Sequence, residues 1–273
     1  MKRVIMPLAA AVCLAVGFTA CKKDSKQVKE DQISDSEIAQ IKALGLNPEG
    51  AKKTAEGLLV EGDIMLSPSD LSSVPTSPEM VVANEEHYRT NNLVNTSTYS
   101  TIKVALNNSS SQHQAAFSAA LDEAIRRYNA ENLRVHFQRV SSGANVTVVA
   151  FYEVSNTLGS SGFPSSSGAP YSQVRMNTYW YSTTTSSTNV NYIGTIMAHE
   201  LGHCIGFRHT DYMNRAYSCG GSSVNEGSAG VGAVYIPGTP SGASAGSWML
   251  ACVGSNQNRP FTSADRTALN YVY

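Results

Sequence analysis

Three of the six histidines in this 273-residue chain fall within one short segment, His199-Glu-Leu-Gly-His203-Cys-Ile-Gly206-Phe-Arg-His209. On an α-helix, residues four apart share a face, so His199 and His203 can present their imidazoles to one metal ion. Gly206 has no Cβ and can adopt a positive φ, which ends the helix and turns the chain back. That turn brings His209 round as a third ligand. The segment therefore requires a helix that ends in a sharp turn.

Glu200 lies beside these ligands and outside the ligand set, where it can act as the general base toward a zinc-activated water. Three protein ligands leave a fourth position open, which is the arrangement of catalytic rather than structural zinc sites. A bare H-E-x-x-H arises by chance about once in a hundred chains of this length, and adding G-x-x-H lowers that to about one in a hundred thousand. The sequence therefore predicts a Zn²⁺ site with Glu200 as catalytic base. The other three histidines, His87, His113 and His136, are expected to lie outside it.

This segment resembles the long zinc motif of the metzincin metallopeptidases, H-E-x-x-H-x-x-G-x-x-H. Together with Thr210-Asp211 it is especially similar to the bacterial dual-action HEIGH metallo-peptidases. The resemblance covers residues 100–273 and implies an α+β fold with a twisted mixed sheet, a zinc-binding active-site helix, a Met-turn and a C-terminal helix. It places the Met-turn at Gly246-Ser-Trp-Met249-Leu. The activity that it implies is peptide-bond hydrolysis.

Hydrophobic periodicity and capping residues predict the elements of an α/β or α+β catalytic domain. The expected strands cover 101–106, 133–138, 146–151 and 171–177, and the expected helices cover 34–45, 117–128, 190–206 and a last segment that begins at 262–265. We expect the strand at 171–177 to be the sheet edge that pairs with an extended substrate. The Gly/Ser-rich run 218–247 is expected to form a wall of the substrate pocket.

The first residues have the pattern of an export signal. Two basic residues precede an apolar stretch, 4–20, so residues 1–20 are the expected signal peptide. Cys21 follows small residues as in a bacterial lipobox, although Phe18 stands where Leu is usual, and we expect Cys21 to carry a lipid. An ordinary secretory signal and an uncleaved anchor are the alternatives. All three place residues 22–273 outside the cytoplasm, as a cell-envelope lipoprotein (outer membrane or periplasm) or as a secreted protein.

Composition limits the partners of the chain. Its net charge of −1 and pI near 6.6 provide neither a basic field for nucleic acid nor a polybasic membrane surface. Beyond residues 4–20 no apolar run is long enough to span a membrane. We expect a monomer that acts on a protein or peptide substrate, binds no nucleic acid and meets the membrane only through an N-terminal lipid anchor.

The expected export also decides which cysteines remain to form a disulfide. Cys13 leaves with the signal and Cys21 takes the lipid, which leaves Cys204, Cys219 and Cys252. Three is odd, so at most one disulfide forms. Cys204 follows a metal ligand on a helix and is expected to pack as a small apolar residue, which favours a disulfide between Cys219 and Cys252.

Residues 21–98 are expected to form a tether and a pro-segment, and residues 99–273 the zinc metallopeptidase catalytic domain. The N-terminal part is broken by prolines and looks too small for a core of its own, so we expect it to lie against the catalytic domain. Cleavage in an exposed 84–98 region, with Arg89 as a candidate site, is expected to activate the enzyme.

A short motif in the pro-segment suggests how latency works. Val60-Glu-Gly-Asp63-Ile resembles the F-x-G-D motif of astacin-like metzincins, with Val60 at the Phe position. In that family the Asp carboxylate occupies the zinc position that water needs, so Asp63 is the expected latency switch. A carboxylate oxygen is a good zinc ligand, and Gly62 lets the backbone approach closely. An ordinary Gly-Asp surface turn is the alternative.

The sequence as a whole predicts an exported zinc-dependent endopeptidase, and two other functions stay open. One is a zinc-containing surface lipoprotein that has lost catalysis and acts as a binding module. The intact Glu200 and the open three-histidine set argue against it, because a binding module needs no base. The other is metal-dependent hydrolysis of an ester or a glycan.

Overall fold

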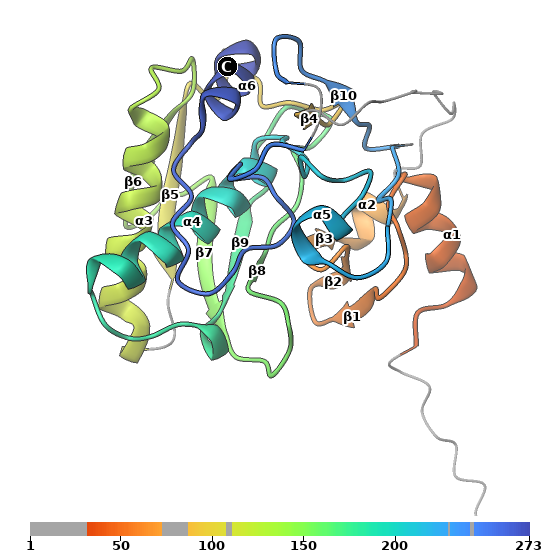
Figure 1. The fold of residues 1–273 in the computed structure, drawn as a ribbon, viewed down its shortest axis with the longest axis horizontal. Helices are drawn as coiled ribbons and strands as arrows, with labels where there is room; N and C mark the ends of the chain where they lie inside the picture. The colour runs from red at the N-terminus through yellow and green to blue at the C-terminus, as the bar shows by residue number, and fades with distance from the viewer. Residues whose placement is uncertain (1–31, 73–86, 108–110, 229, 241–242) are drawn as a thin grey trace, which may run out of the picture. The chain divides into compact units, whose positions relative to one another are not determined.

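A five-stranded mixed sheet organises the larger part of the chain (Figure 1). The structure is a computed structural model that describes residues 32–72, 87–107, 111–228, 230–240 and 243–273. The strands are β5 (Thr101–Asn107), β6 (His136–Arg139), β7 (Val146–Phe151), β8 (Gly159–Ser160) and β9 (Gln173–Asn177). They lie in the order β6-β5-β7-β9-β8, and every neighbouring pair is parallel except β9 with β8.

Two long helices pack side by side against this sheet. Helix α3 (Gln114–Asn129) contacts β5 and β6, while α4 (Ser187–Cys204) contacts β8, β9 and α3. Their apolar faces and that of the sheet share one buried cluster, which includes Val104, Val148, Val174, Phe117, Leu121, Ile193 and Met197. The last helix, α6 (Ser263–Val272), begins at a capping box between Thr262 and Asp265. The core therefore fixes α4, which carries the metal motif, against the sheet.

The α+β architecture with a mixed sheet and a C-terminal helix is confirmed. Strands β5 and β7 lie where the apolar pattern predicts them. Strand β6 is shorter than expected because the Arg134 N–H donates to the Tyr273 carbonyl instead of to a neighbouring strand. Helix α4 begins at Ser187, three residues before the prediction, since the Ser186 side chain caps it by accepting from the Asn189 N–H.

The prediction for the sheet edge is wrong. Strand β9 lies between β7 and β8, and the edge is β8, which is only two residues long. Just beyond it, Ser161 forms a parallel bridge with Ile64. The Ser161 N–H donates to the Asp63 carbonyl at 2.8 Å, and the Met65 N–H donates to the Ser161 carbonyl at 2.6 Å. The edge is therefore covered by the segment around Asp63.

The N-terminal part has a small core of its own, contrary to expectation. Its elements are α1 (Asp35–Ala43), β1 (Lys52–Thr54), β2 (Gly57–Val60), β3 (Ile64–Leu66) and α2 (Pro68–Ser72). They bury an apolar cluster of Ile41, Leu44, Leu46, Leu58, Val60, Ile64, Leu66 and Leu71. Phe163 and Val231 of the larger part pack against this cluster, and the Val231 N–H donates to the Leu44 carbonyl. Residues Asp31–Tyr273 accordingly form one compact unit.

Residues 87–90 are part of the interior, so the expectation of an exposed 84–98 region is wrong there. Strand β4 (Tyr88–Arg89) pairs with β10 (Val234–Tyr235), and Arg89 also bridges Phe207. The side chains of His87, Tyr88 and Thr90 are buried. Because a peptidase needs an accessible extended backbone, the paired Arg89 is a poor cleavage site.

Residues 1–31 lie outside the described part, and with them the expected signal peptide and Cys21. Among the helices of the described residues, none is both long enough and apolar enough to cross a membrane. The short elements that remain are η1 (Ser111–His113), η2 (Thr178–Trp180) and α5 (Ala216–Cys219).

Candidate active site

The three histidines of the motif meet at one point. His199 and His203 lie one turn apart on α4, and the helix ends just after them. Gly206 follows at φ 104°, where a Cβ would lie only 3.0 Å from the Asn92 carbonyl oxygen. This left-handed turn returns His209 to the helix. The Nε2 atom of His203 lies 3.0 Å from Nε2 of His199 and 3.2 Å from Nε2 of His209.

Each imidazole is held by a hydrogen bond at its other nitrogen. Nδ1 of His199 lies 2.7 Å from the Trp248 carbonyl oxygen, and Nδ1 of His203 lies 2.8 Å from the Phe207 carbonyl oxygen. Nδ1 of His209 lies 2.7 Å from the Glu226 carboxylate. A carbonyl oxygen only accepts, so Nδ1 carries the proton in His199 and His203, and their Nε2 lone pairs face inward. Burial acts to raise the pKa of Glu226, but His209, Arg208 and Arg215 lower it below its usual value. The Glu226 carboxylate is therefore an acceptor for Nδ1 of His209.

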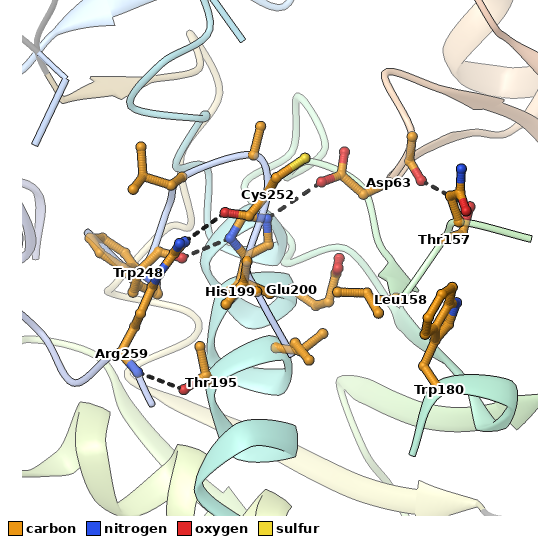
Figure 2. A pocket seen from close by; sticks show the side chains of 18 of the residues that line it. Asp63, Thr157, Leu158, Trp180, Thr195, His199, Glu200, Trp248, Cys252 and Arg259 are labelled. Atoms are coloured by element: carbon orange, nitrogen blue, oxygen red, sulfur yellow. Dashed lines mark hydrogen bonds and ion pairs between the residues drawn. The ribbon is translucent and has the colours of Figure 1, made fainter. Parts of the chain in front are cut away.

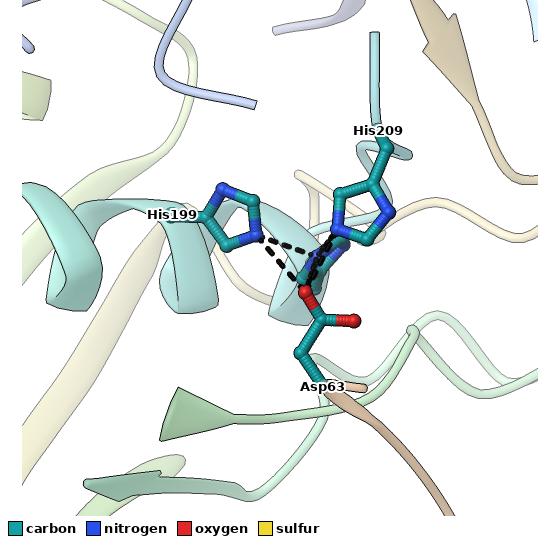
Figure 3. Close-up of side chains that lie close together, drawn as sticks. Asp63, His199 and His209 are labelled. Carbon is teal, nitrogen blue, oxygen red and sulfur yellow. Dashed lines mark hydrogen bonds and ion pairs between the residues drawn. The ribbon is translucent and has the colours of Figure 1, made fainter. Parts of the chain in front are cut away.

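A fourth ligand atom completes the group. Oδ2 of Asp63 lies 2.8 Å from Nε2 of His209, 3.5 Å from Nε2 of His199 and 3.9 Å from Nε2 of His203 (Figure 3). Burial acts to raise the pKa of Asp63, yet the facing histidines hold it well below its usual range.

The donor set fits a metal ion. All four ligand atoms lie within 4.8 Å of one another. Ligand atoms at about 2.0–2.1 Å from a tetrahedral zinc ion lie about 3.3 Å apart, close to the distances between the Nε2 atoms. Burial lowers the pKa of His203 to about 4, which keeps it in the neutral form that binds metals. Burial acts to lower the pKa of His209, but Asp63 and Glu226 raise it well above its usual value, so the point where the three histidines meet favours a positive charge.

Glu200 lies beside the three ligands and is buried. Its Oε2 atom accepts a hydrogen bond from the Ser161 hydroxyl at 2.7 Å. Burial, together with the charge of Asp63, raises the pKa of Glu200 well above its ordinary value. A raised pKa suits a carboxylate that takes up a proton and later gives it back. Sequence reasoning missed Ser161, which lies in a Ser/Gly/Pro loop with no periodic signal.

Met249 packs against α4 at Gly202, next to His203. Its sulfur is so close to α4 that a Cβ on Gly202 would approach it to 2.6 Å. The Met249 carbonyl accepts from the Thr210 N–H, and the preceding carbonyl, of Trp248, holds His199. Asp265 anchors the turn at residues 246–250: its Oδ1 atom lies 2.6 Å from the Ser247 hydroxyl and 2.6 Å from Nε2 of His87.

Comparison with protein families decides the identity. The family model of the dual-action HEIGH metallo-peptidases matches residues 58–273. The chain belongs to this family. It is therefore a metallopeptidase, and the matched range includes Asp63 as well as the histidine motif. A solved structure of myroilysin aligns with a TM-score of 0.42 and 16% identity, over 67% of this chain and 96% of that one. Among curated proteins, no match was found.

A cavity of about 570 Å³ opens beside the histidines of this metallopeptidase. Figure 2 shows His199 and Glu200 projecting into it from α4, with Asp63 reaching toward them from the N-terminal hairpin. Trp248, residues 250–255 and Arg259 line another side. None of the described residues of 218–247 lines it, so that prediction is wrong. Part of this run instead contacts residues 44 and 91, as in the bonds of Val231 to Leu44 and Asn91.

The cysteines of the metallopeptidase that lie in the described part are arranged as follows. Cys219 and Cys252 form a disulfide with their Cα atoms 5.1 Å apart, and Cys204 is a buried free thiol. The disulfide joins the segment after the ligands to the segment after Met249, which lines the cavity. Ser218 supports the same junction, since its hydroxyl donates to Asp211 and accepts from the Cys252 N–H.

Proposed function

We propose that this metallopeptidase is an exported zinc endopeptidase that is synthesised in a latent form. The observation that carries the proposal is the convergence of three inward Nε2 lone pairs and one Asp63 oxygen beside a buried glutamate. His199, His203 and His209 would hold the zinc. When bound, zinc supplies a Lewis acid that polarises the scissile carbonyl and lowers the pKa of water toward about 7.

Glu200 is the general base in this proposal. Its carboxylate takes the proton of the attacking water and delivers it to the leaving amine. The Ser161 hydroxyl holds Oε2, and in this proposal Oε1 takes the proton of the water. Gly159 closes the other side, because a Cβ there would lie 2.9 Å from Oε1. The carboxylate thus has little freedom to turn away from the reaction.

Asp63 is the latch. Its carboxylate takes the position that the reacting water needs, and its backbone pairs with Ser161 at the sheet edge that an extended substrate would use. One segment therefore blocks both the metal and the edge. A cut that releases it must precede His87, because residues 87–90 are built into the catalytic part.

The remaining features of the proposal come from the sequence. Residues 1–20 direct export, Cys21 carries a lipid anchor, and the substrate is a protein or peptide rather than nucleic acid. The proposal also makes the enzyme a monomer. The Cys219–Cys252 disulfide supports export, since such bonds persist in oxidising compartments.

The test is a casein or gelatin digest by the zinc-loaded chain, before and after limited proteolysis by a serine protease that is then inhibited. We expect little hydrolysis by the uncut chain, strong hydrolysis after cutting, and loss of activity on prolonged treatment with a chelator. Zinc at one equivalent without hydrolysis after cutting would overturn the proposal in favour of a binding module. Hydrolysis that persists after metal removal would overturn it in favour of metal-free chemistry.

A further inference from the structure

Two arginines and two glutamates form a buried ionic cluster directly behind His209. Nη2 of Arg208 lies 3.5 Å from Oε2 of Glu61 and 3.6 Å from Oε2 of Glu226. Nε of Arg215 lies 3.3 Å from Oε1 of Glu226, and its Nη1 donates to the Glu61 carbonyl. Glu61 belongs to the N-terminal hairpin, whereas the other three belong to the catalytic part. The cluster thus joins the latch segment to the active site.

Without Glu61 this cluster has two guanidinium groups and only one carboxylate. Glu226 is already engaged by Nδ1 of His209. Arg208 cannot turn away, because its Nη1 atom donates to the carbonyls of Gly227 and Gly232. Its Nη2 atom has no hydrogen-bond partner among the described residues and points at Glu61. Arg215 also feels the buried Asp211 carboxylate. Arg208 is therefore the guanidinium that keeps only Glu226 when Glu61 leaves.

The latch segment is bent and brings the Glu61 side chain to Arg208, although burial and the neighbouring Glu226 raise the pKa of Glu61 well above its usual value. Glu61 has φ 54°, a left-handed conformation that is unfavourable for a residue with a side chain. The Asn47 N–H donates to its Oε1 atom at 2.9 Å and holds the carboxylate in place. Although Glu61, Glu226 and His209 have ligand atoms close together, the two guanidinium groups beside them disfavour a second cation.

We propose that Arg208 and Arg215 form a substrate subsite for an acidic side chain, which Glu61 occupies in the latent protein. This inference rests on the proposed function. Arg215 lines the same cavity as His199 and Glu200, so a substrate reaches it from the active site. Glu61 lies two residues from Asp63 across a bent backbone, so in an extended substrate the acidic side chain belongs within two residues of the scissile bond.

The strength of the preference follows from the cost of an unpaired buried charge. A carboxylate pairs electrostatically with Arg208, as Glu61 does at 3.5 Å, while a neutral side chain of the same shape leaves Arg208 with Glu226 alone, which it shares with Arg215. An interaction with the energy of a hydrogen bond to a charged group changes kcat/KM by about tenfold to hundredfold. We therefore expect kcat/KM for a Glu peptide to exceed that for the matched Gln peptide by about tenfold to hundredfold.

The experiment uses the full chain, zinc-loaded and activated by a serine protease that is then inhibited. A peptide library locates the cleavage sites, and matched Glu, Gln and Lys peptides then give kcat/KM at the enriched position. We expect Arg215→Gln to remove the Glu preference and Arg215→Glu to favour the Lys peptide. Arg126→Gln is the control, since that side chain is exposed on α3 and should leave the preference unchanged.

Equal kcat/KM for the Glu and Gln peptides in the wild type would overturn the subsite while leaving the proposed peptidase intact. So would a Glu preference that survives Arg215→Gln. Absence of any chelator-sensitive cleavage would overturn the proposed function itself. If the Arg215 variants do not fold, Glu61→Gln in the uncut chain provides the second measurement. Its residual activity should rise about tenfold, and an unchanged residual activity would refute the role of the cluster.

Discussion

Oδ2 of Asp63 lies 2.8 Å from Nε2 of His209, across 146 residues of chain. This contact connects the N-terminal hairpin to the last of the three histidines at the point where a metal fits. The backbone of the same residue pairs with Ser161, next to the hydroxyl that holds Glu200. A single segment therefore touches the three histidines, the sheet edge and the residue whose hydroxyl binds Glu200.

Asp63→Ala should give the uncut chain measurable peptidase activity, because it frees the metal position without cutting the backbone. Casein hydrolysis by the uncut, zinc-loaded variant and wild type is the measurement. Asp35→Ala, at an exposed position of the first turn of α1, is the control. Equal activity of Asp63→Ala and the uncut wild type would show that the carboxylate is not the latch.

Glu200→Gln should lower kcat by about a thousandfold and keep zinc near one equivalent, since it removes the base and no metal ligand. The amide oxygen can still accept from the Ser161 hydroxyl, so the local fold is preserved. The measurements are the zinc content and kcat of the activated variant, compared with those of the activated wild type. Wild-type turnover in this variant would assign the base elsewhere.

His209→Ala should lower the zinc content itself, because it removes one of three protein ligands. The matched control is His136→Ala, whose side chain is exposed on β6 and lies outside the metal cluster. Zinc is measured after dialysis against metal-free buffer. Full metal content in the His209 variant would place the third ligand elsewhere.

The local geometry of the site could be predicted from the sequence, because it depends on spacing. Residues four apart share a helix face, and a glycine allows the turn that returns His209. The groups that orient the imidazoles could not be predicted. Two of them are backbone carbonyls, at Trp248 and Phe207, and the third, Glu226, lies in an irregular run without any period. Their positions depend on tertiary packing alone.

The same difference between local spacing and tertiary packing explains why two predictions about the fold are wrong. Strand β9 has an alternating pattern that favours a strand, whereas the two residues of β8 are too few to produce a periodic signal, so the sequence predicts the edge at 171–177. The apolar residues at 58–65 favour an extended segment, yet their pattern does not show that β2 and β3 pack with Ile41 and Leu71 into a separate core. Local pattern cannot show such long-range packing.

Ser161→Ala should lower kcat by about tenfold with unchanged zinc content, because the Glu200 carboxylate loses the hydroxyl that orients it. The Ser161 hydrogen bond lowers the pKa of Glu200 against the effect of burial, so its removal raises that pKa further. A base acts when it is ionised, and the acid limb of the pH–rate profile should therefore move to higher pH. Ser160→Ala is the matched control, since that buried hydroxyl has no hydrogen-bond partner among the described residues. An unmoved acid limb would contradict the orienting role.

Asp265→Asn should destabilise the protein at neutral pH and flatten its loss of stability in acid. Burial acts to raise the pKa of Asp265, but the hydrogen bonds from His87 and Ser247 hold it below its ordinary value. An acid whose pKa is lower in the folded state stabilises the fold above its unfolded pKa of about 3.9, and this contribution is lost as the pH falls through the folded pKa.

Breaking the buried pair with His87 should cost about 3 kcal/mol in the free energy of unfolding. Urea unfolding at pH 6 and pH 3 measures both effects, with the exposed Asp122→Asn as control. If the variant loses as much stability between these pH values as the wild type does, Asp265 is not the group that anchors the Met249 turn through its charge.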